Sequence, residues 1–189
     1  MHKVFRPHLL GIDDGPLAVR SGGDATIVGV AMEGPDLVEA VAVTRFPTDG
    51  ADVTAFLADW VAGLRVRPAL QGIVLGGITI AGLAIVDLPE LARVLALPVL
   101  AISRRDPRDH RLAVALAAAG LSDRLEIVRR TPPALPVAGG GFVACAGASA
   151  EHAAALADVA RGKSDLPEPL RVAHLIAGAV VHGESHGRP

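Results

Sequence analysis

Three strand-like segments in a row, followed by alternating strands and helices, limit the folds open to this chain. The first three segments are apolar or alternating runs separated by Gly-rich and Gly-Pro turns, at residues 9–13, 25–32 and 37–46. Short turns between consecutive strands are typical of antiparallel hairpins, so these segments predict a three-stranded meander. The alternation that follows predicts further strands with helices packed on the faces of the sheet. A mixed sheet satisfies both patterns.

The rest of the chain supplies the alternating elements. Expected strands lie at residues 72–75, 99–102 and 142–146, and expected helices at residues 52–64, 89–97, 108–119, 149–161 and 167–181. Residues 125–128 are a candidate for one more short strand, and residues 131–141 are expected to form a loop. We therefore expect an α/β protein with the three-layer, ribonuclease H-like order of elements. The chain is expected to be a single domain over residues 1–189, with a polar tail from about residue 182.

Composition excludes several classes of protein. Half of the residues are apolar, which argues against intrinsic disorder, and the absence of Tyr excludes a binding surface built on stacked tyrosines. The lone Cys145 cannot form an internal disulfide, and the N-terminal stretch lacks a long apolar segment. The uncharged run at residues 68–86 approaches membrane-spanning length, but its glycines favour a buried strand followed by a loop. We therefore expect a cytoplasmic protein that does not contact a membrane.

Charge is unevenly divided along the chain. The net charge is −2, but residues 1–94 hold seven Lys and Arg against eleven Asp and Glu, whereas residues 95–189 hold eleven against nine. The densest basic cluster is residues 104–111, RRDPRDHR. An acidic half beside an arginine-bearing half suits a metal site that adjoins a phosphate-contacting surface, although a solvated loop and helix face explains the charges equally well.

The stretch HLLGIDDGP, residues 8–16, places two adjacent carboxylates at the end of the first strand. Adjacent strand residues point to opposite faces, so Asp13 and Asp14 are not expected to serve the same site. An Asp on an apolar strand is costly to bury without a partner, which favours a functional role for Asp13. Asp14 is expected to shape the Gly15-Pro16 turn, with a role in the site as a secondary possibility.

Three stretches resemble the endonuclease V superfamily, and more closely its compact branch named endonuclease dU. GIDDGP resembles the opening strand of that family, LPVLAISR at residues 97–104 resembles an internal strand, and PEPLRVAH at residues 167–174 resembles the start of the last helix. The resemblance covers nearly the whole chain. It implies that Asp13 is a metal ligand, that Arg104 faces the scissile phosphate, and that His174 belongs to the metal site.

Two positions depart from endonuclease V. Gly76 stands where that family carries a second Asp, and its catalytic Glu has Asp49 and Asp52 as the nearest acids here. The resemblance therefore implies catalytic roles for Asp13, His174, Asp49 and Asp52, with Mg²⁺ or Mn²⁺ held by Asp13, Asp49 and His174. Asp49 also reads as a plain turn residue, and Asp52 as a helix N-cap. The expected substrate-binding residues are Arg104, Arg105, Arg171, Gly76 and Gly77.

The resemblance implies a metal-dependent endonuclease acting on nucleic acid, DNA rather than RNA, that contains uracil or hypoxanthine. Gly76 and the missing Glu leave an alternative open, in which the chain keeps the fold and binds nucleic acid without cutting it. A third reading is a scaffold with no nucleic-acid affinity. The oligomeric state is not predicted.

Overall fold

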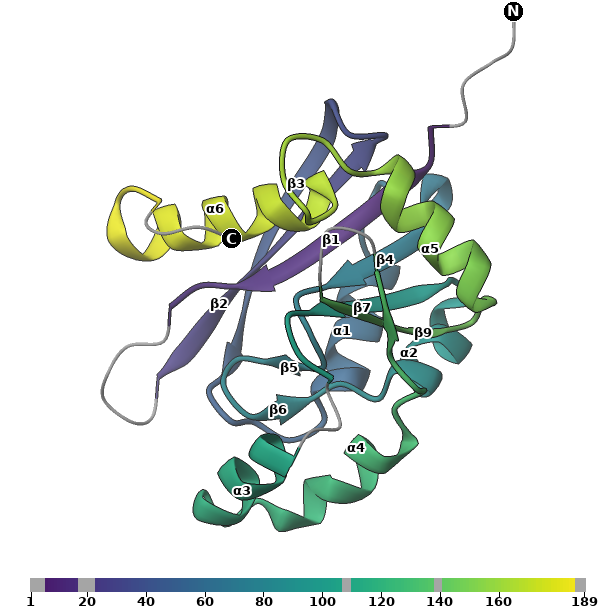
Figure 1. The fold of residues 1–189 in the computed structure, drawn as a ribbon. Helices are drawn as coiled ribbons and strands as arrows, with labels where there is room; N and C mark the ends of the chain where they lie inside the picture. The colour runs from purple at the N-terminus through teal and green to yellow at the C-terminus, as the bar shows by residue number, and fades with distance from the viewer. Residues whose placement is uncertain (1–5, 17–22, 107–109, 138–140, 186–189) are drawn as a thin grey trace, which may run out of the picture.

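The computed structural model describes residues 6–16, 23–106, 110–137 and 141–185, and a seven-stranded mixed sheet runs through their centre (Figure 1). The strands are β1 (His8–Asp14), β2 (Asp24–Glu33), β3 (Leu37–Pro47), β4 (Gly72–Leu75), β5 (Thr79–Ile80), β6 (Ala84–Ile85), β7 (Val99–Ser103), β8 (Leu135–Pro136) and β9 (Phe142–Ala146). The sheet has the order β3-β2-β1-β4-β7-β9-β8, and β5 and β6 form a separate hairpin. β1, β2 and β3 pair antiparallel as the expected meander, and β4 and β7 run parallel to β1.

The α-helices are α1 (Val53–Ala62), α2 (Leu88–Leu95), α3 (His110–Ala118), α4 (Leu125–Arg130), α5 (Ala150–Val159) and α6 (Glu168–His182). Single 3₁₀ turns, η1 (Arg67–Ala69) and η2 (Ser122–Arg124), precede β4 and α4. The five expected helices are confirmed to within one or two residues at each end, although residues 107–109, at the expected start of α3, lie outside the described residues. Among the residues that the structure describes, no helix is long and apolar enough to cross a bilayer.

Helices cover both faces of the sheet, which gives three layers (Figure 1). On one face, Leu10, Ile12 and Ile73 pack in one apolar core with residues of α1 and α2. On the other face, α6 lies along β1 and β2, and α5 packs over Leu9, Val74 and Leu100. Because strand side chains alternate between faces, each residue of β1 belongs to one layer or the other. The expected three-layer α/β fold is confirmed.

One predicted element is wrong. Residues 125–128 belong to helix α4, which continues directly from the 3₁₀ turn at 122–124. The sheet position beside β9 is instead taken by β8, a two-residue strand inside the segment expected to be a loop. Four residues are too few to separate a helical from a strand period, so the apolar pattern alone could not distinguish the two.

Candidate active site at the end of β1

Gly11, Asp13 and Gly15 lie on the same face of β1, and α6 packs directly against that face. A Cβ atom on Gly11 would lie 2.1 Å from the carbonyl carbon of Pro169, and one on Gly15 would lie 2.9 Å from the carbonyl oxygen of Ala177. The two glycines therefore let the helix backbone approach the strand at two points. Asp13 lies between them, and it faces the helix turn that lies between the two contacts.

That helix turn carries His174. Nδ1 of His174 lies 2.8 Å from Oδ2 of Asp13, and the two side chains are 37% and 18% exposed. The hydrogen bond to Asp13 raises the pKa of His174, an effect that burial and the nearby Arg104 oppose. The structure thus brings together two residues 161 positions apart that the sequence motifs single out. Both groups remain within reach of solvent.

Gly76, directly after β4, lies against the other oxygen of Asp13. A Cβ on Gly76 would lie 2.8 Å from Oδ1 of Asp13 and 3.7 Å from a methyl group of Leu170. No side chain fits there unless Asp13 moves. Gly77 follows with a φ of +119°, a conformation that favours glycine, and no atom lies within 4 Å of where its Cβ would be. Gly76 therefore borders the Asp13 carboxylate, and Gly77 lies in the turn that follows β4.

Asp14 faces the opposite side of the sheet, as alternation requires, but it does not shape the Gly15-Pro16 turn. Its Oδ2 accepts a hydrogen bond of 2.9 Å from the backbone N–H of Ala81, in the turn of the β5–β6 hairpin. Burial raises the pKa of Asp14 to about 6, and the charge of Asp13 adds to this shift. The prediction that Asp14 shapes the adjacent turn is wrong, because its carboxylate bonds a hairpin 67 positions away.

Asp49 forms hydrogen bonds to the same β5–β6 hairpin. Its Oδ1 accepts a hydrogen bond of 2.6 Å from Leu83 N–H, and its own N–H donates to the carbonyl oxygen of Ala81. Arg124 completes this contact by donating to the carbonyl oxygens of Leu83 and Asp49. Within the described residues, Asp49 does not join Asp13 and His174 in a set of three ligand atoms lying within 4.8 Å of one another. Arg124 had no signal in the sequence beyond its charge.

Asp52 lies on the other side of the sheet from His174. It occupies the N-cap position of α1 with a φ of +59°, but its carboxylate makes no capping hydrogen bond. Its side chain instead lines a cavity of about 330 Å³ between α1, α2 and α4, together with Asp59, Asp87 and Glu90. The structure does not bring Asp52 to Asp13.

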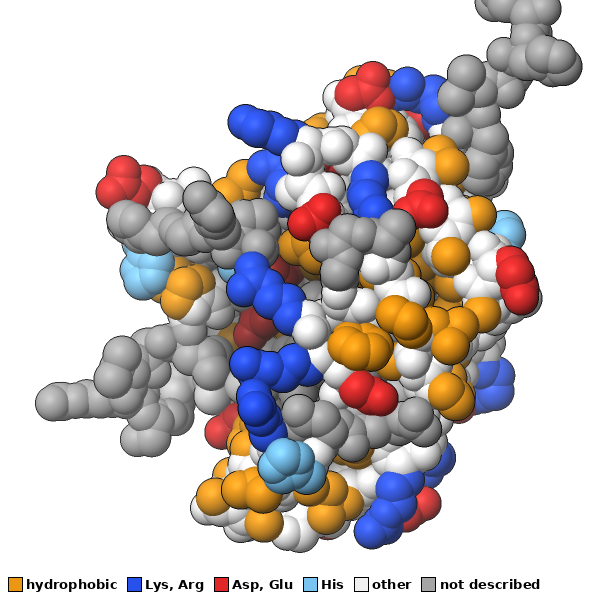
Figure 2. All heavy atoms as spheres, in the orientation of Figure 1, with side chains coloured by type: hydrophobic (Ala, Val, Ile, Leu, Met, Phe, Trp, Pro, Cys, Tyr) orange, Lys and Arg blue, Asp and Glu red, His pale blue; other side chains and the backbone are white. Residues whose placement is uncertain are grey.

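The expected phosphate-contacting arginines lie on two elements, the end of β7 and the first turn of α6. Arg104 and Arg105 are exposed where β7 ends, and Arg104 is close enough to His174 to affect its pKa. Arg171 lies one helical turn before His174, and its guanidinium bonds Glu168 at 2.6 and 2.8 Å. Figure 2 shows basic side chains gathered in the middle of this face, beside acidic side chains that lie deeper. Positive charge therefore borders the Asp13–His174 pair.

Glu168 is a structural partner that the sequence motif did not reveal. It is 5% exposed, accepts from Lys163 N–H at 3.1 Å and pairs with Arg171. A Cβ on Gly162 would lie 2.7 Å from its side chain. The first turn of α6 is thus fixed by a buried ion pair, which in turn sets where His174 lies along β1.

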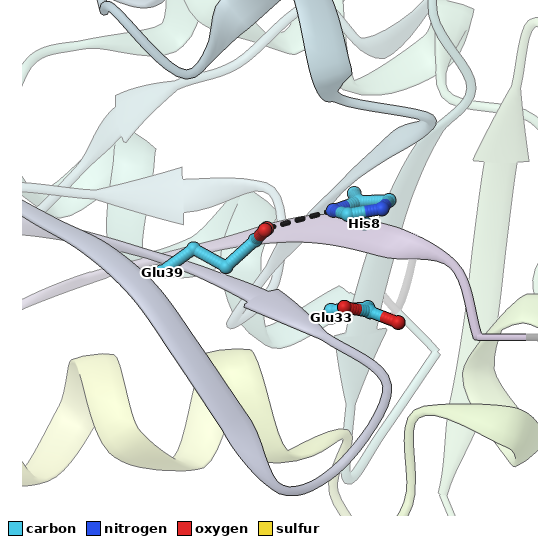
Figure 3. A group of neighbouring side chains, drawn as sticks. All are labelled: His8, Glu33 and Glu39. Carbon is cyan, nitrogen blue, oxygen red and sulfur yellow. Dashed lines mark hydrogen bonds and ion pairs between the residues drawn. The ribbon is translucent and has the colours of Figure 1, made fainter.

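A second histidine–carboxylate group lies at the other end of β1. His8, Glu33 and Glu39 are the one set of three residues in the described part of the chain whose possible ligand atoms all lie within 4.8 Å of one another (Figure 3). His8 Nδ1 lies 2.7 Å from Glu39 Oε2, and Arg6 lies 3.5 Å from Glu33. The arginine already balances one carboxylate, so we interpret this group as a network of surface ion pairs.

The Asp13 end of β1 combines the features of a hydrolytic site. It has a carboxylate with one oxygen bonded to a histidine and the other beside a glycine, and Arg104 is close by. A partly exposed carboxylate suits a hard divalent cation, and a histidine with one ring nitrogen on a carboxylate suits proton transfer through the other. These features lie at the carboxyl ends of the parallel strands β1 and β4.

The fold is that of endonuclease V. The structure superposes on endonuclease V from Streptomyces avermitilis with a TM-score of 0.57 at 15% identity, covering 95% of this chain and 83% of that one. Endonuclease V from Ciona intestinalis, solved in complex with a DNA containing an inosine, gives a TM-score of 0.54 at 15% identity, covering 89% of this chain and 82% of that one. The ribonuclease H-like fold class is thereby shown.

The family match is more specific than the fold match. The model of the endonuclease dU family matches residues 6–181, so the chain belongs to the endonuclease dU family. A UPF0215 protein of Methanothermobacter thermautotrophicus is 33% identical, over 95% of this chain and 90% of that protein. One from Deinococcus radiodurans is 37% identical, over 96% and 92%. A protein of unknown function from Archaeoglobus fulgidus has the same fold, with a TM-score of 0.85 at 30% identity over 94% of this chain and all of that one. The resemblance read from the three motifs is confirmed.

Proposed function

We propose that the protein is a divalent-metal-dependent endonuclease that cleaves phosphodiester bonds in nucleic acid containing uracil or hypoxanthine. Family membership and the endonuclease V fold support a nuclease-like role. The observation that carries the proposal is the Asp13–His174 pair at 2.8 Å, with Gly76 against the free oxygen of Asp13. The DNA bound to the Ciona protein contains an inosine followed by a ribo-adenosine, which supports a deaminated base in a nucleic-acid substrate.

The residues present fit a divalent cation. Asp13 is a partly exposed carboxylate whose Oδ1 lies beside Gly76, which presents no side chain. Mg²⁺ keeps several waters and needs only one or two protein carboxylates, so Asp13 can be the principal ligand of Mg²⁺ or Mn²⁺. Asp49 contacts the same hairpin turn as Asp14 and remains the proposed additional acid. A bound cation would orient the attacking water and neutralise charge on the phosphate.

The side chains have separate roles in this proposal. His174 bonds Asp13 through Nδ1 and transfers a proton through Nε2. The bond to Asp13 raises the pKa of His174 and fixes the orientation of its ring. Arg104 and Arg105 contact the phosphates on either side of the scissile bond, and Arg171 fixes the helix that carries His174. Gly76 carries no side chain that would displace the Asp13 carboxylate, and Gly77 allows the chain its left-handed turn beside it, so both glycines keep Asp13 available to the substrate.

The second candidate is a nucleic-acid-binding protein that does not cleave. It is favoured by Gly76, which supplies no carboxylate, and by the position of Asp52 away from Asp13. Binding through arginines would then be sensitive to salt but indifferent to divalent metal.

A nicking assay separates the two candidates. Wild-type protein, Asp13→Asn and the exposed control Asp123→Asn are incubated with duplex and single-stranded oligonucleotides that contain uracil, hypoxanthine or neither. Each reaction is run with Mg²⁺, with Mn²⁺ and with EDTA. The proposal expects metal-dependent cleavage near the altered base by wild type and Asp123→Asn, and its loss in Asp13→Asn. Binding without cleavage by all three proteins, in every metal, would instead support the second candidate.

A further inference from the structure

β3 is an edge strand that no other element covers. It runs for eleven residues, from Leu37 to Pro47, and pairs only with β2 in the described part of the chain. Its outer backbone N–H and C=O groups therefore have no strand partner. Proteins usually protect such an edge with charged side chains, Pro, a β-bulge or a very short strand. In β3 the charges and the bulge lie toward the ends, at Glu39 and Arg45, and the segment between them, residues 40–44, has none of these protections.

The same strand exposes a stripe of large apolar side chains. Val38, Val41 and Val43 are 46%, 48% and 51% exposed. Val41 and Val43 lie opposite Val30 and Val28 of β2, which are fully buried under α6. The helix thus covers the valines of β2 and leaves those of β3 uncovered, so the buried apolar layer stops one strand short of the edge.

The sequence of β3 is complementary to itself. An antiparallel pairing about a twofold axis at Ala42 would place Val41 of one copy opposite Val43 of the other, on the same face. On the opposite face, the small side chains of Ala40 and Ala42 would meet Thr44 and Ala42. Glu39 is bulged and bonds His8 of its own copy, so the paired segment would end there, and Arg45 would mark its other end on the valine face. A shift of two residues would place Arg45 opposite a valine or a leucine.

We propose that a second copy of this chain binds along β3, in an antiparallel register centred on Ala42, to form a twofold dimer with a continuous sheet. The free strand edge calls for another strand, and the self-complementary valine stripe selects this chain's own β3, with Arg45 disfavouring the shifted registers. β3 is separated from β1 by β2, so the dimer leaves the Asp13 end of β1 open. The inference does not depend on the proposed nuclease activity.

Light scattering and sedimentation of the purified full chain test the association. Wild type is expected at twice the 19.3 kDa of the monomer at micromolar concentration. The double variant Val41→Lys/Val43→Lys is expected to be monomeric with an unchanged circular dichroism spectrum, because both side chains are exposed. The control Val114→Lys, at a 62% exposed position of α3, is expected to remain dimeric. A monomeric wild type, or a dimer that survives the double substitution, would overturn the proposal.

A disulfide test fixes the register. In a Cys145→Ala background, Ala42→Cys places two thiols on the twofold axis, where facing Cα atoms in antiparallel strands lie about 5 Å apart, within disulfide range. Mild oxidation is therefore expected to yield a covalent dimer on a non-reducing gel. Thr44→Cys in the same background is the control, since four residues of offset separate its Cα atoms by about 14 Å. Equal cross-linking of the two variants, or cross-linking of Thr44→Cys alone, would contradict the register.

Discussion

The two ends of β1 carry similar contacts in different surroundings. At the start of the strand, His8 Nδ1 lies 2.7 Å from a carboxylate oxygen of Glu39, and at its end His174 Nδ1 lies 2.8 Å from one of Asp13. The two pairs are similarly exposed, 30% and 27% for His8 and Glu39 against 37% and 18% for His174 and Asp13, but the first is accompanied by Arg6, which pairs with Glu33 and Asp36. The second pair lies under a helix, beside a glycine and next to a second acid whose pKa is raised. A histidine–carboxylate contact is therefore not a site by itself, and the backbone packed around it decides what it can do.

The largest expected effect concerns the packing that creates this difference. Gly11→Ala would place a Cβ 2.1 Å from Pro169, so α6 would have to move away from β1, at a cost of about 3 kcal/mol in the free energy of unfolding. Urea denaturation measures this cost. Gly23→Ala, where nothing lies within 4 Å of the added atom, is the control and is expected to change stability by less than about 0.5 kcal/mol. Equal stability of the two variants would show that the close approach of α6 to β1 is not tight.

The next effect compares the two carboxylates directly. Asp13→Asn is expected to lower the rate of nicking by at least about 100-fold, because it removes the carboxylate proposed to hold the metal and the charged partner of His174. Glu39→Gln is expected to leave the rate within about 2-fold of wild type, since a pair of exposed surface charges contributes little. Initial rates on the same uracil-containing oligonucleotide provide the comparison. A similar loss in both variants would mean that the two ends of β1 act together.

A smaller effect is expected at Gly76. Gly76→Ala places a methyl group 2.8 Å from Oδ1 of Asp13, which turns the carboxylate and is expected to cost about 10-fold in nicking rate with little change in stability. Gly63→Ala, where the nearest atoms lie at 3.6 Å, is a matched control. Gly76→Asp would restore the acid found in endonuclease V but would meet the same clash, so a gain of activity in that variant would contradict the packing.

The smallest effect is a shift in a titration. NMR of the His174 ring in metal-free buffer is expected to show a pKa above 6.5 in wild type and a lower value in Asp13→Asn, because the hydrogen bond to Asp13 favours the imidazolium. A raised pKa in the folded state means that the pair stabilises the protein fully below pH 6.5 and loses that contribution as pH rises through the folded value. An identical His174 pKa in the two proteins would contradict the hydrogen bond.

The sequence predicted the parts of the molecule that depend on local pattern or on motif. The meander, the strands β4, β7 and β9 and the five longer helices follow from apolar period and turn residues. Asp13 and His174 came from two motifs that match the family at each end of the chain. Their contact also has a local signal, because Gly11 and Gly15 alternate with Asp13 on a single strand face.

Contacts made by loops could not be predicted in the same way. Asp14 binds Ala81, and Asp49 and Arg124 bind the same hairpin, but each of these side chains meets a backbone group with no residue-type signature. Helix α4 was mistaken for a strand because four apolar-rich residues fit either period. Asp52 lies at the helix N-cap as predicted. Its backbone is left-handed, however, and its carboxylate makes no capping hydrogen bond.

The packing of α6 on Gly11 and Gly15 also determines when the Asp13–His174 contact can form during synthesis. A chain that is still being synthesised already contains Asp13, but its partner His174 is made 161 residues later and reaches the strand only when the last helix packs. Because the Asp13–His174 contact joins residues near both ends of the chain, it can form only after translation has passed the final helix.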